Sequence, residues 1–217
     1  MRGGGLPWAT LAWAGLLVLS VGLTVAAAVE TPLPGDAYLL ARGQSLPFPG
    51  RTAAEAIRAV TGTQVVMATG AVLALALVAL GYRREALFLA LGLVLLPLLQ
   101  TGLKEAVDRP RPGPPWAELR AGYSSPSFPA GHVMSPTFLY GYLLWLAWRG
   151  HAPPPWRWPL SLASVVVLPL AGPPNVWLGV HWPSDVLGGW AWGLVLAGAA
   201  ALGEERARRR RWAPAES

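Results

Sequence analysis

Six long apolar runs, separated by polar loops, constrain the fold of this chain more than any other feature. Only 13% of the 217 residues are charged, compared with roughly 25% in soluble domains. A helix that crosses a bilayer needs about 20 mostly apolar residues. The runs are about Leu6–Val29, Gly62–Tyr82, Ala86–Leu103, Val133–Trp148, Pro159–Gly172 and Val186–Gly203. We therefore expect an all-α integral membrane bundle of six transmembrane helices, in a domain of residues 1–203 with a basic cytoplasmic tail of residues 204–217.

The loops between these runs predict the orientation of the bundle. With the N-terminus inside, the inner segments hold ten Lys and Arg residues and the outer segments hold seven. Because cytoplasmic loops carry the excess of positive charge, we expect both termini in the cytoplasm of a multi-pass protein of the cell inner membrane. A cleaved signal peptide is the alternative for the first run, since Ala26-Ala27-Ala28 resembles a cleavage site. That run is longer than a signal core of about 7–15 residues, so we expect a retained helix.

Charge and cysteine content exclude several classes of function. The net charge of +6 comes with a run of arginines after the last apolar segment, at Arg206 and from Arg208 to Arg211. Such a run is typical of a cytoplasmic anchor beside anionic lipid, so we expect the membrane as a partner and no nucleic acid. The chain has no cysteine, which excludes disulfides and thiolate metal sites. The sequence does not predict the oligomeric state.

The longest outer loop joins the first two runs and is rich in Pro and Gly up to Arg51. Beyond this point Ala53, Ala56, Ile57 and Val60 recur at helical spacing. The pattern predicts an amphipathic helix of one or two turns, which either lies at the membrane interface or packs on the bundle.

Scarce residue types gather where the apolar runs end on the outer side: the only lysine, Lys104, two of the three histidines, His132 and His181, and Asp185. Pro183 is tolerated in the first turn of a helix but not inside one, so a helix should begin there. His181 then precedes the helix and Asp185 lies in its first turn. From there the carboxylate can bind one imidazole nitrogen and free the other as a nucleophile or base. The alternative is an interfacial histidine beside a helix-capping aspartate.

Two further outer segments add chemistry suited to a phosphate group. Gly131 lets the backbone approach a ligand closely, and the N–H groups that open the next helix can point at phosphate oxygens. His132 at this place can donate a proton to a leaving oxygen, and Lys104 supplies positive charge. Each feature alone has a simpler interpretation, as a histidine facing the interface or a charged loop end. Together they predict a phosphate site at the outer membrane face.

Three motifs at these positions resemble the signatures of the type 2 phosphatidic acid phosphatase (PAP2) superfamily. Lys104, followed after six residues by Arg111-Pro112, is similar to the first signature. Pro129-Ala130-Gly131-His132 is similar to the second, and His181 with Asp185 to the third. Their order, spacing and helix layout extend the resemblance over about residues 6–203.

The resemblance implies a role for each matching residue. His181 would attack phosphorus and form a phosphohistidine, Asp185 would orient it, and His132 would protonate the leaving group. The phosphoryl oxygens would be held by Lys104, Arg111 and the backbone around Ala130 and Gly131. No metal or cofactor is implied, because cationic side chains take that place.

The chain departs from the family pattern at two positions. The third signature begins with an arginine six residues before its histidine, where this chain has Asn175, and the second has a serine where this chain has Ala130. An arginine makes bidentate phosphate contacts that asparagine cannot reproduce, and the loss of one such donor costs roughly 100- to 1,000-fold in rate. Arg109, in a second Arg-Pro pair, is the candidate that compensates as a further substrate-binding residue.

The resemblance leaves two hypotheses for the function. The first is a membrane lipid phosphatase that hydrolyses a lipid phosphate monoester or pyrophosphate at the extracytoplasmic face. Undecaprenyl pyrophosphate, phosphatidic acid and phosphatidylglycerol phosphate are the candidate substrates, and the breadth of the family and the outward site slightly favour the first of them. The second hypothesis, motivated by Asn175 and Ala130, is a catalytically attenuated PAP2-like protein that binds or transports phospholipid.

Overall fold

The computed structural model describes residues 5–47, 50–149 and 154–210, and in these ranges the chain is all-helical. No strand occurs in them, which confirms the predicted all-α class. Six long helices coincide with the six expected apolar runs, and three shorter helices lie in the loops. The helices are α1 (Gly5–Val29), α2 (Asp36–Ser45), α3 (Arg51–Thr61), α4 (Thr63–Ala79), α5 (Arg83–Val107), α6 (Gly131–Trp148), α7 (Pro154–Leu170), α8 (Pro173–Trp177) and α9 (Pro183–Arg210).

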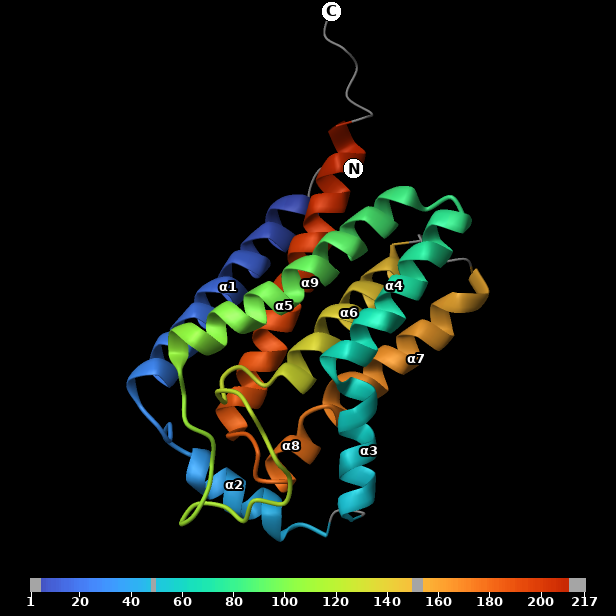
Figure 1. Ribbon diagram of the computed structural model, residues 1–217. Helices are drawn as coiled ribbons and strands as arrows, with labels where there is room; N and C mark the ends of the chain where they lie inside the picture. Colours follow the sequence, from blue (N-terminus) through green and yellow to red (C-terminus); the bar gives the residue numbers. More distant parts are fainter. Residues whose placement is uncertain (1–4, 48–49, 150–153, 211–217) are drawn as a thin grey trace, which may run out of the picture.

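The six long helices form one elongated bundle, and the short helices gather at one end of it (Figure 1). α1 begins and α9 ends at the opposite end, where Arg206 Nη2 donates to Thr10 Oγ1 at 3.3 Å. The loops that carry the three motifs lie at the end with α2, α3 and α8. The described ends of the chain and the candidate site are therefore separated by the length of the bundle.

Four helical stretches in the described ranges are long and apolar enough to cross a membrane: Trp8–Val29, Arg83–Val107, Pro155–Trp177 and Pro183–Arg209. The pair α3 and α4 would make a fifth, although it is bent by 44°. α6 is not among them; it lies inside the bundle against α9, α7 and α4, and most of its side chains are buried. A helix surrounded by protein can carry polar residues such as Ser135 and Thr137, which a lipid-facing helix would avoid.

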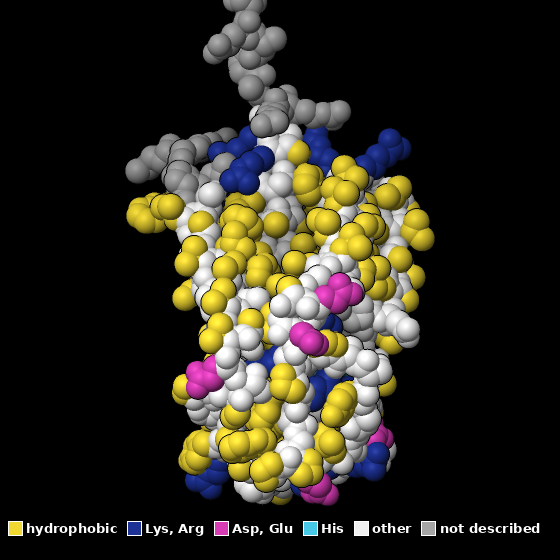
Figure 2. Space-filling view, turned by 60° about the vertical axis from the view of Figure 1, so that its left-hand side comes forward, with side chains coloured by type: hydrophobic (Ala, Val, Ile, Leu, Met, Phe, Trp, Pro, Cys, Tyr) yellow, Lys and Arg dark blue, Asp and Glu magenta, His cyan; other side chains and the backbone are white. Residues whose placement is uncertain are grey.

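The surface of the bundle is that expected of helices that cross a membrane. Figure 2 shows apolar side chains over much of the visible face. Lys and Arg side chains are visible at both ends, but only the end where the described termini lie shows them without Asp or Glu. Leu19, Leu75 and Leu162 are among the large apolar residues that point outward from α1, α4 and α7. An exposed apolar band of this extent is typical of a surface that contacts lipid or another apolar partner.

Two helices extend past the C-terminal bounds of the expected runs. α5 continues past Leu103 to Val107, and α9 continues past Gly203 to Arg210, so the segment after Leu202 is not frayed up to that point. Glu205 accepts hydrogen bonds from Arg208 at 2.7 Å and from Arg209 at 3.0 Å. These i,i+3 and i,i+4 pairs stabilise the last turns of α9. The rest of the predicted tail, residues 211–217, lies outside the described residues.

The predicted amphipathic helix exists as α3, and it packs on the bundle against α4, α6 and α8. The face that packs differs from the apolar stripe in the sequence. Ala54 and Thr61 are buried, whereas Ala56 and Val60 are exposed. Ala53 and Ile57 are half-buried, and the exposed face also carries Arg51 and Glu55, so the apolar stripe lies only partly against the protein.

Candidate functional site

His181 and Asp185 are placed by a sharp turn between α8 and α9. The N–H groups of Val180 and His181 both donate to the carbonyl oxygen of Asn175, at 3.2 and 3.3 Å. Gly179 has φ 71°, and a Cβ there would lie 2.3 Å from the carbonyl oxygen of Glu118. Only glycine fits this position, for both conformational and steric reasons. The turn holds His181 with 1% of its surface exposed, directly before α9.

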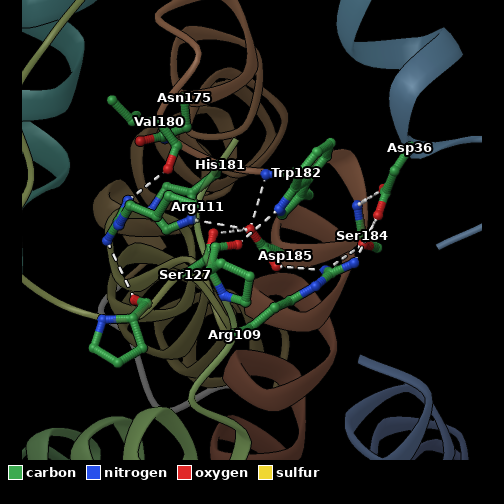
Figure 3. A network of polar contacts seen from close by, with 12 residues as sticks. Asp36, Arg109, Arg111, Ser127, Asn175, Val180, His181, Trp182, Ser184 and Asp185 are labelled. Atoms are coloured by element: carbon green, nitrogen blue, oxygen red, sulfur yellow. Dashed lines mark hydrogen bonds and ion pairs between the residues drawn. The ribbon is translucent and has the colours of Figure 1, made fainter. Parts of the chain in front are cut away.

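Asp185 combines the two roles that the sequence offered as alternatives. Its Oδ2 lies 3.4 Å from Nδ1 of His181 and accepts the backbone N–H of Trp182 at 2.8 Å. The second bond caps the N-terminus of α9, in the manner of an acidic residue at the third helical position. Capping therefore locks the carboxylate in the orientation in which it reaches the imidazole (Figure 3).

Arg111 determines the tautomer of His181. Its Nη1 lies 3.0 Å from Nε2 of His181 and donates to the carbonyl oxygen of Val180 at 2.6 Å. A guanidinium is only a donor, so Nε2 accepts and the ring proton is on Nδ1, facing Asp185. The unprotonated nitrogen of His181 thus points toward a cation, where a phosphoryl group would be attracted.

The backbone after α5 brings Arg111 to this place. Asp108 ends α5 in the left-handed conformation, with φ 43°, which Asp adopts more readily than most residues. Pro110 and Pro112 prevent the helix from resuming. Arg111 is further tied to the next loop by Nε, which donates to the carbonyl oxygen of Ser125 at 2.8 Å, and by Tyr123, whose ring centre lies 5.0 Å away.

Arg109 points away from Arg111 and into the protein. Its Nη1 donates to Asp185 Oδ1 at 2.7 Å and its Nη2 donates to Asp36 Oδ2 at 2.8 Å. Its side chain has no exposed surface. In this structure Arg109 is therefore bound by two carboxylates and does not offer a donor to a ligand, in contrast to the substrate-binding role expected for it.

Asp36 and Ser184 complete this buried group, and sequence reasoning missed both. Asp36 begins α2 and accepts the N–H of Ser184 at 2.9 Å and its hydroxyl at 2.7 Å. Ser184 Oγ also accepts from Arg109 at 2.7 Å. The one signal for Asp36 was an acidic residue within an otherwise apolar part of the outer loop, and nothing in the sequence linked it to α9.

Ser127 and Ala130 join the second motif to the third. Ser127 donates from its hydroxyl to Asp185 Oδ2, and its N–H donates to the carbonyl oxygen of Arg109 at 2.9 Å. The N–H of Ala130 donates to the carbonyl oxygen of Asp185 at 3.0 Å. The Ala130 amide is therefore already occupied, and the N–H groups that open α6 without an intrahelical acceptor are those of Gly131 and His132.

His132 lies at the start of α6 against the junction of α3 and α4. A Cβ on Gly62 would lie 3.8 Å from Nε2 of His132. Beneath it, Gln100 Nε2 donates to Ser135 Oγ at 2.7 Å, and Thr63 Oγ1 lies 2.8 Å from the same hydroxyl. This polar group fixes α4, α5 and α6 relative to one another and hence the start of α6. A side chain on Gly131 would meet only ordinary contacts, so packing does not require glycine there.

Lys104 and Asn175 differ in how they relate to the site. Lys104 donates from Nζ to the carbonyl oxygen of Pro126 in the loop that also binds Arg111. Asn175 is fully buried, and its Nδ2 donates to the carbonyl oxygen of Ala171 at 2.8 Å. The side-chain amide thus points toward the end of α7. The contact of Asn175 with His181 is made by its backbone carbonyl oxygen, which accepts the N–H of His181.

Burial sets the protonation of the two groups at the centre. It lowers the pKa of His181 to about 3, although the hydrogen bond to Asp185 opposes this shift. The imidazole is therefore neutral at physiological pH, as a nucleophile must be. Burial also lowers the pKa of Arg111 to about 10, with Asp185 opposing the shift and Arg58 adding to it. Arg111 remains positively charged at neutral pH.

The structure therefore brings His181, Asp185 and Arg111 into direct contact and places His132 and Lys104 near them. The charges of Arg111 and Lys104 act on both histidines. A neutral nitrogen nucleophile, a second imidazole and two cations at one end of a bundle form a site suited to phosphoryl transfer.

Comparison with known proteins agrees with this chemistry. A curated relative, phosphatidylglycerophosphatase B of Bacillus subtilis (strain 168), is 37% identical over 101 residues, which cover 46% of this chain and 48% of the relative. The match thus spans about half the length of that relative. A solved structure, a transmembrane PAP2-type phosphatidylglycerolphosphate phosphatase from Bacillus subtilis, superposes with a TM-score of 0.75 at 24% identity, over 89% of this chain and 96% of the other.

The superposition shows a shared fold, and with the apolar helices it identifies a multi-pass membrane protein. The model of the PAP2 superfamily matches residues 85–209, which include all three motifs and more than half of the chain. The chain belongs to the PAP2 superfamily.

Proposed function

We propose that this protein is a membrane lipid phosphatase that hydrolyses a phosphate monoester or pyrophosphate through a phosphohistidine. The observation that carries the proposal is the orientation of His181, whose unprotonated Nε2 faces the Arg111 guanidinium while Nδ1 faces Asp185. An imidazole held in this tautomer is a competent nucleophile, and the adjacent cation stabilises the charge that develops on the phosphoryl oxygens.

The reaction would proceed in two steps. In the first, Nε2 of His181 attacks phosphorus, the bond from phosphorus to the leaving oxygen breaks, and His132 gives that oxygen a proton. Asp185 stabilises the positive charge on the phosphorylated imidazole. In the second, His132 takes a proton from water, the water oxygen attacks phosphorus, and the bond from phosphorus to Nε2 of His181 breaks. Inorganic phosphate leaves, and the imidazole of His181 is neutral again. The cations Lys104 and Arg111 hold the phosphoryl oxygens, and no metal takes part.

Phosphatidylglycerol phosphate is the substrate that we propose first. The names of both relatives carry this lipid, and no residue of this chain singles out undecaprenyl pyrophosphate. Phosphate release from purified protein in detergent, with all three candidate lipids, tests the assignment. We expect release that disappears in His181→Ala and persists with a chelator, and trapping of the phosphorylated imidazole at Nε2. A rate that chelation abolishes would contradict a mechanism without metal.

The second candidate function is a phospholipid-binding protein with weak or no catalysis. It is favoured by two observations. The side-chain amide of Asn175 donates to the carbonyl oxygen of Ala171, and the backbone N–H of Ala130 donates to the carbonyl oxygen of Asp185, so both groups are already bound within the protein. No phosphate release by the unmodified chain, with lipid phosphate still bound, would support it over the phosphatase.

The proposed topology has six spans, cytoplasmic termini and a site that faces the extracytoplasmic side of the inner membrane. The basic end of the bundle in Figure 2 supports this orientation. Because the chain has no cysteine, single cysteines test it without background. Glu118→Cys, beside the site, should react with a membrane-impermeant maleimide in spheroplasts, whereas Arg83→Cys should react only after lysis. The opposite pattern would reverse the orientation.

A further inference from the structure

One cation beside the site has no role in the mechanism. Arg58 lies in the last turn of α3 and, from the sequence alone, is an ordinary outer-loop arginine. In the structure it lines a cavity of about 390 Å³ together with His132, and the cavity extends along Thr63 and Val65 at the start of α4. Arg58 thus shares a cavity with the imidazole that the mechanism uses as an acid.

The guanidinium of Arg58 is incompletely satisfied. Its Nε is buried and has no hydrogen-bond partner within the part of the chain that the structure describes. The carboxylate that acts on it, Glu55, already accepts from Arg51 Nε at 2.7 Å. A buried donor without an acceptor is costly, and this cost is expected where an anionic ligand supplies the acceptor.

The positive charges around His132 point to the same conclusion. The charge of Arg58 acts on His132 more strongly than the charges of Arg111 and Lys104, and it also acts on Arg111. Three cations that converge on one imidazole repel each other. An anion in the cavity relieves this repulsion.

The position of Arg58 indicates which part of a substrate it would meet, and this step rests on the proposed function. His181 attacks phosphorus from one side and His132 protonates the leaving oxygen on the other. The leaving group therefore lies on the side of His132, in the cavity that Arg58 lines, while Arg111 is held beside His181.

We propose that Arg58 binds a second phosphate, one that the leaving group carries. Phosphatidylglycerol phosphate leaves as phosphatidylglycerol, which has an anionic phosphodiester, and an isoprenyl pyrophosphate leaves as a lipid phosphate. Phosphatidic acid leaves as neutral diacylglycerol. Arg58 thus makes the site selective for lipids with an anionic leaving group.

Hydrolysis by the Arg58→Gln variant tests this selectivity. We expect kcat/KM for phosphatidylglycerol phosphate and for undecaprenyl pyrophosphate to fall about 10- to 100-fold, the range for a lost charge-assisted hydrogen bond. For phosphatidic acid in the same micelles we expect a change of less than about threefold. Arg42→Gln, which removes an exposed arginine of α2 that bonds to Tyr38, is the control and should leave all three values unchanged. An equal loss on all lipids, or no loss on any, would overturn the inference.

A binding measurement separates this inference from the proposed function. In the His181→Ala background, Arg58→Gln should weaken binding of intact phosphatidylglycerol phosphate about 10-fold or more and leave binding of phosphatidic acid unchanged. Absence of hydrolysis by the unmodified protein would contradict the phosphatase assignment, and this binding difference would still support Arg58. Equal binding of phosphatidylglycerol phosphate with and without Arg58→Gln would exclude the role of Arg58 even in an active phosphatase.

Discussion

Arg109 and Arg111 are two residues apart, each is followed by proline, and the protein uses them in opposite ways. Arg109 is fully buried between Asp36 and Asp185. Arg111 binds backbone carbonyl groups and Nε2 of His181. One arginine holds the third motif in place, and the other faces the space where a phosphate would lie (Figure 3).

The difference shows that residues from distant segments determine whether an arginine is neutralised or can attract a ligand. Asp36 lies in α2, far from Arg109 in sequence, and it neutralises Arg109 together with Asp185. Within the described part of the chain, the hydrogen bonds of Arg111 go to Ser125, Pro126, Val180 and His181, none of which is a carboxylate. A cation without a carboxylate partner retains its attraction for a ligand anion, whereas a neutralised one contributes to the framework.

Removal of Arg109 should have the largest effect on the stability of the protein. Arg109→Met leaves two buried carboxylates without their shared cation, and we expect a loss of about 3–5 kcal/mol in the free energy of unfolding. Unfolding by sodium dodecyl sulfate in mixed micelles, followed by circular dichroism, measures it. Arg111→Met should cost less than about 1 kcal/mol in the same assay. If Arg109→Met fails to fold, adding Asp36→Asn should restore part of the stability, because it removes one unpaired charge. Equal stability of both single variants would contradict the assignment.

Activity should show the reverse order. Arg111→Met should lower kcat by roughly 100- to 1,000-fold, because it removes a cation from the developing charge on the phosphoryl group. Arg111→Lys should recover only part of this loss, since an ammonium lacks the planar fork. The rate of phosphate release from the lipid measures both variants. A kcat within threefold of the unmodified protein for Arg111→Met would remove Arg111 from the site.

Acid should destabilise the protein through His181. The pKa of its imidazole is about 3 in the folded protein and 6.5 as a free side chain, because burial disfavours the charged form. Between these values the unfolded chain binds the proton more readily, so stability is complete above about pH 6.5 and falls as the pH approaches 3. His181→Asn should flatten this pH dependence in melting temperatures recorded from pH 7 to pH 4. Identical slopes would show that His181 is not the group that titrates.

The smallest effect is expected at the position where the signature arginine is missing. The sequence suggested that Asn175→Arg would raise turnover. The structure argues against a gain, because Asn175 is fully buried and faces Ala171. We expect unchanged or lower turnover and a loss of about 1–3 kcal/mol from overpacking. A clear rise in kcat for Asn175→Arg, measured in the same assay as Arg58→Gln, would indicate that the site lacks a cation at position 175.

The six long helices, α3, the three motifs and their common end of the bundle could be predicted from the sequence, whereas α2 and α8 were not. Apolar runs of about 20 residues and prolines at helix starts act locally, so Pro183 predicted both the start of α9 and the contact between Asp185 and His181. It also gave the correct class, since the lack of charge over long runs excludes a soluble fold. The run Val133–Trp148 predicted α6, but only the assembled bundle shows that other helices surround it.

The pairing of the polar groups could be learned only from the three-dimensional structure. The clamp of Asp36 on Arg109 joins segments 73 residues apart, and no local pattern encodes such a contact. The packing of α3 was equally invisible: its apolar stripe left open whether the helix lies at the membrane interface or packs on the bundle. In the structure Ala56 and Val60 are exposed, while Arg58 lines a cavity with His132. Hydrophobic periodicity locates the apolar side of a helix. Whether that side meets protein or lipid depends on the assembled bundle.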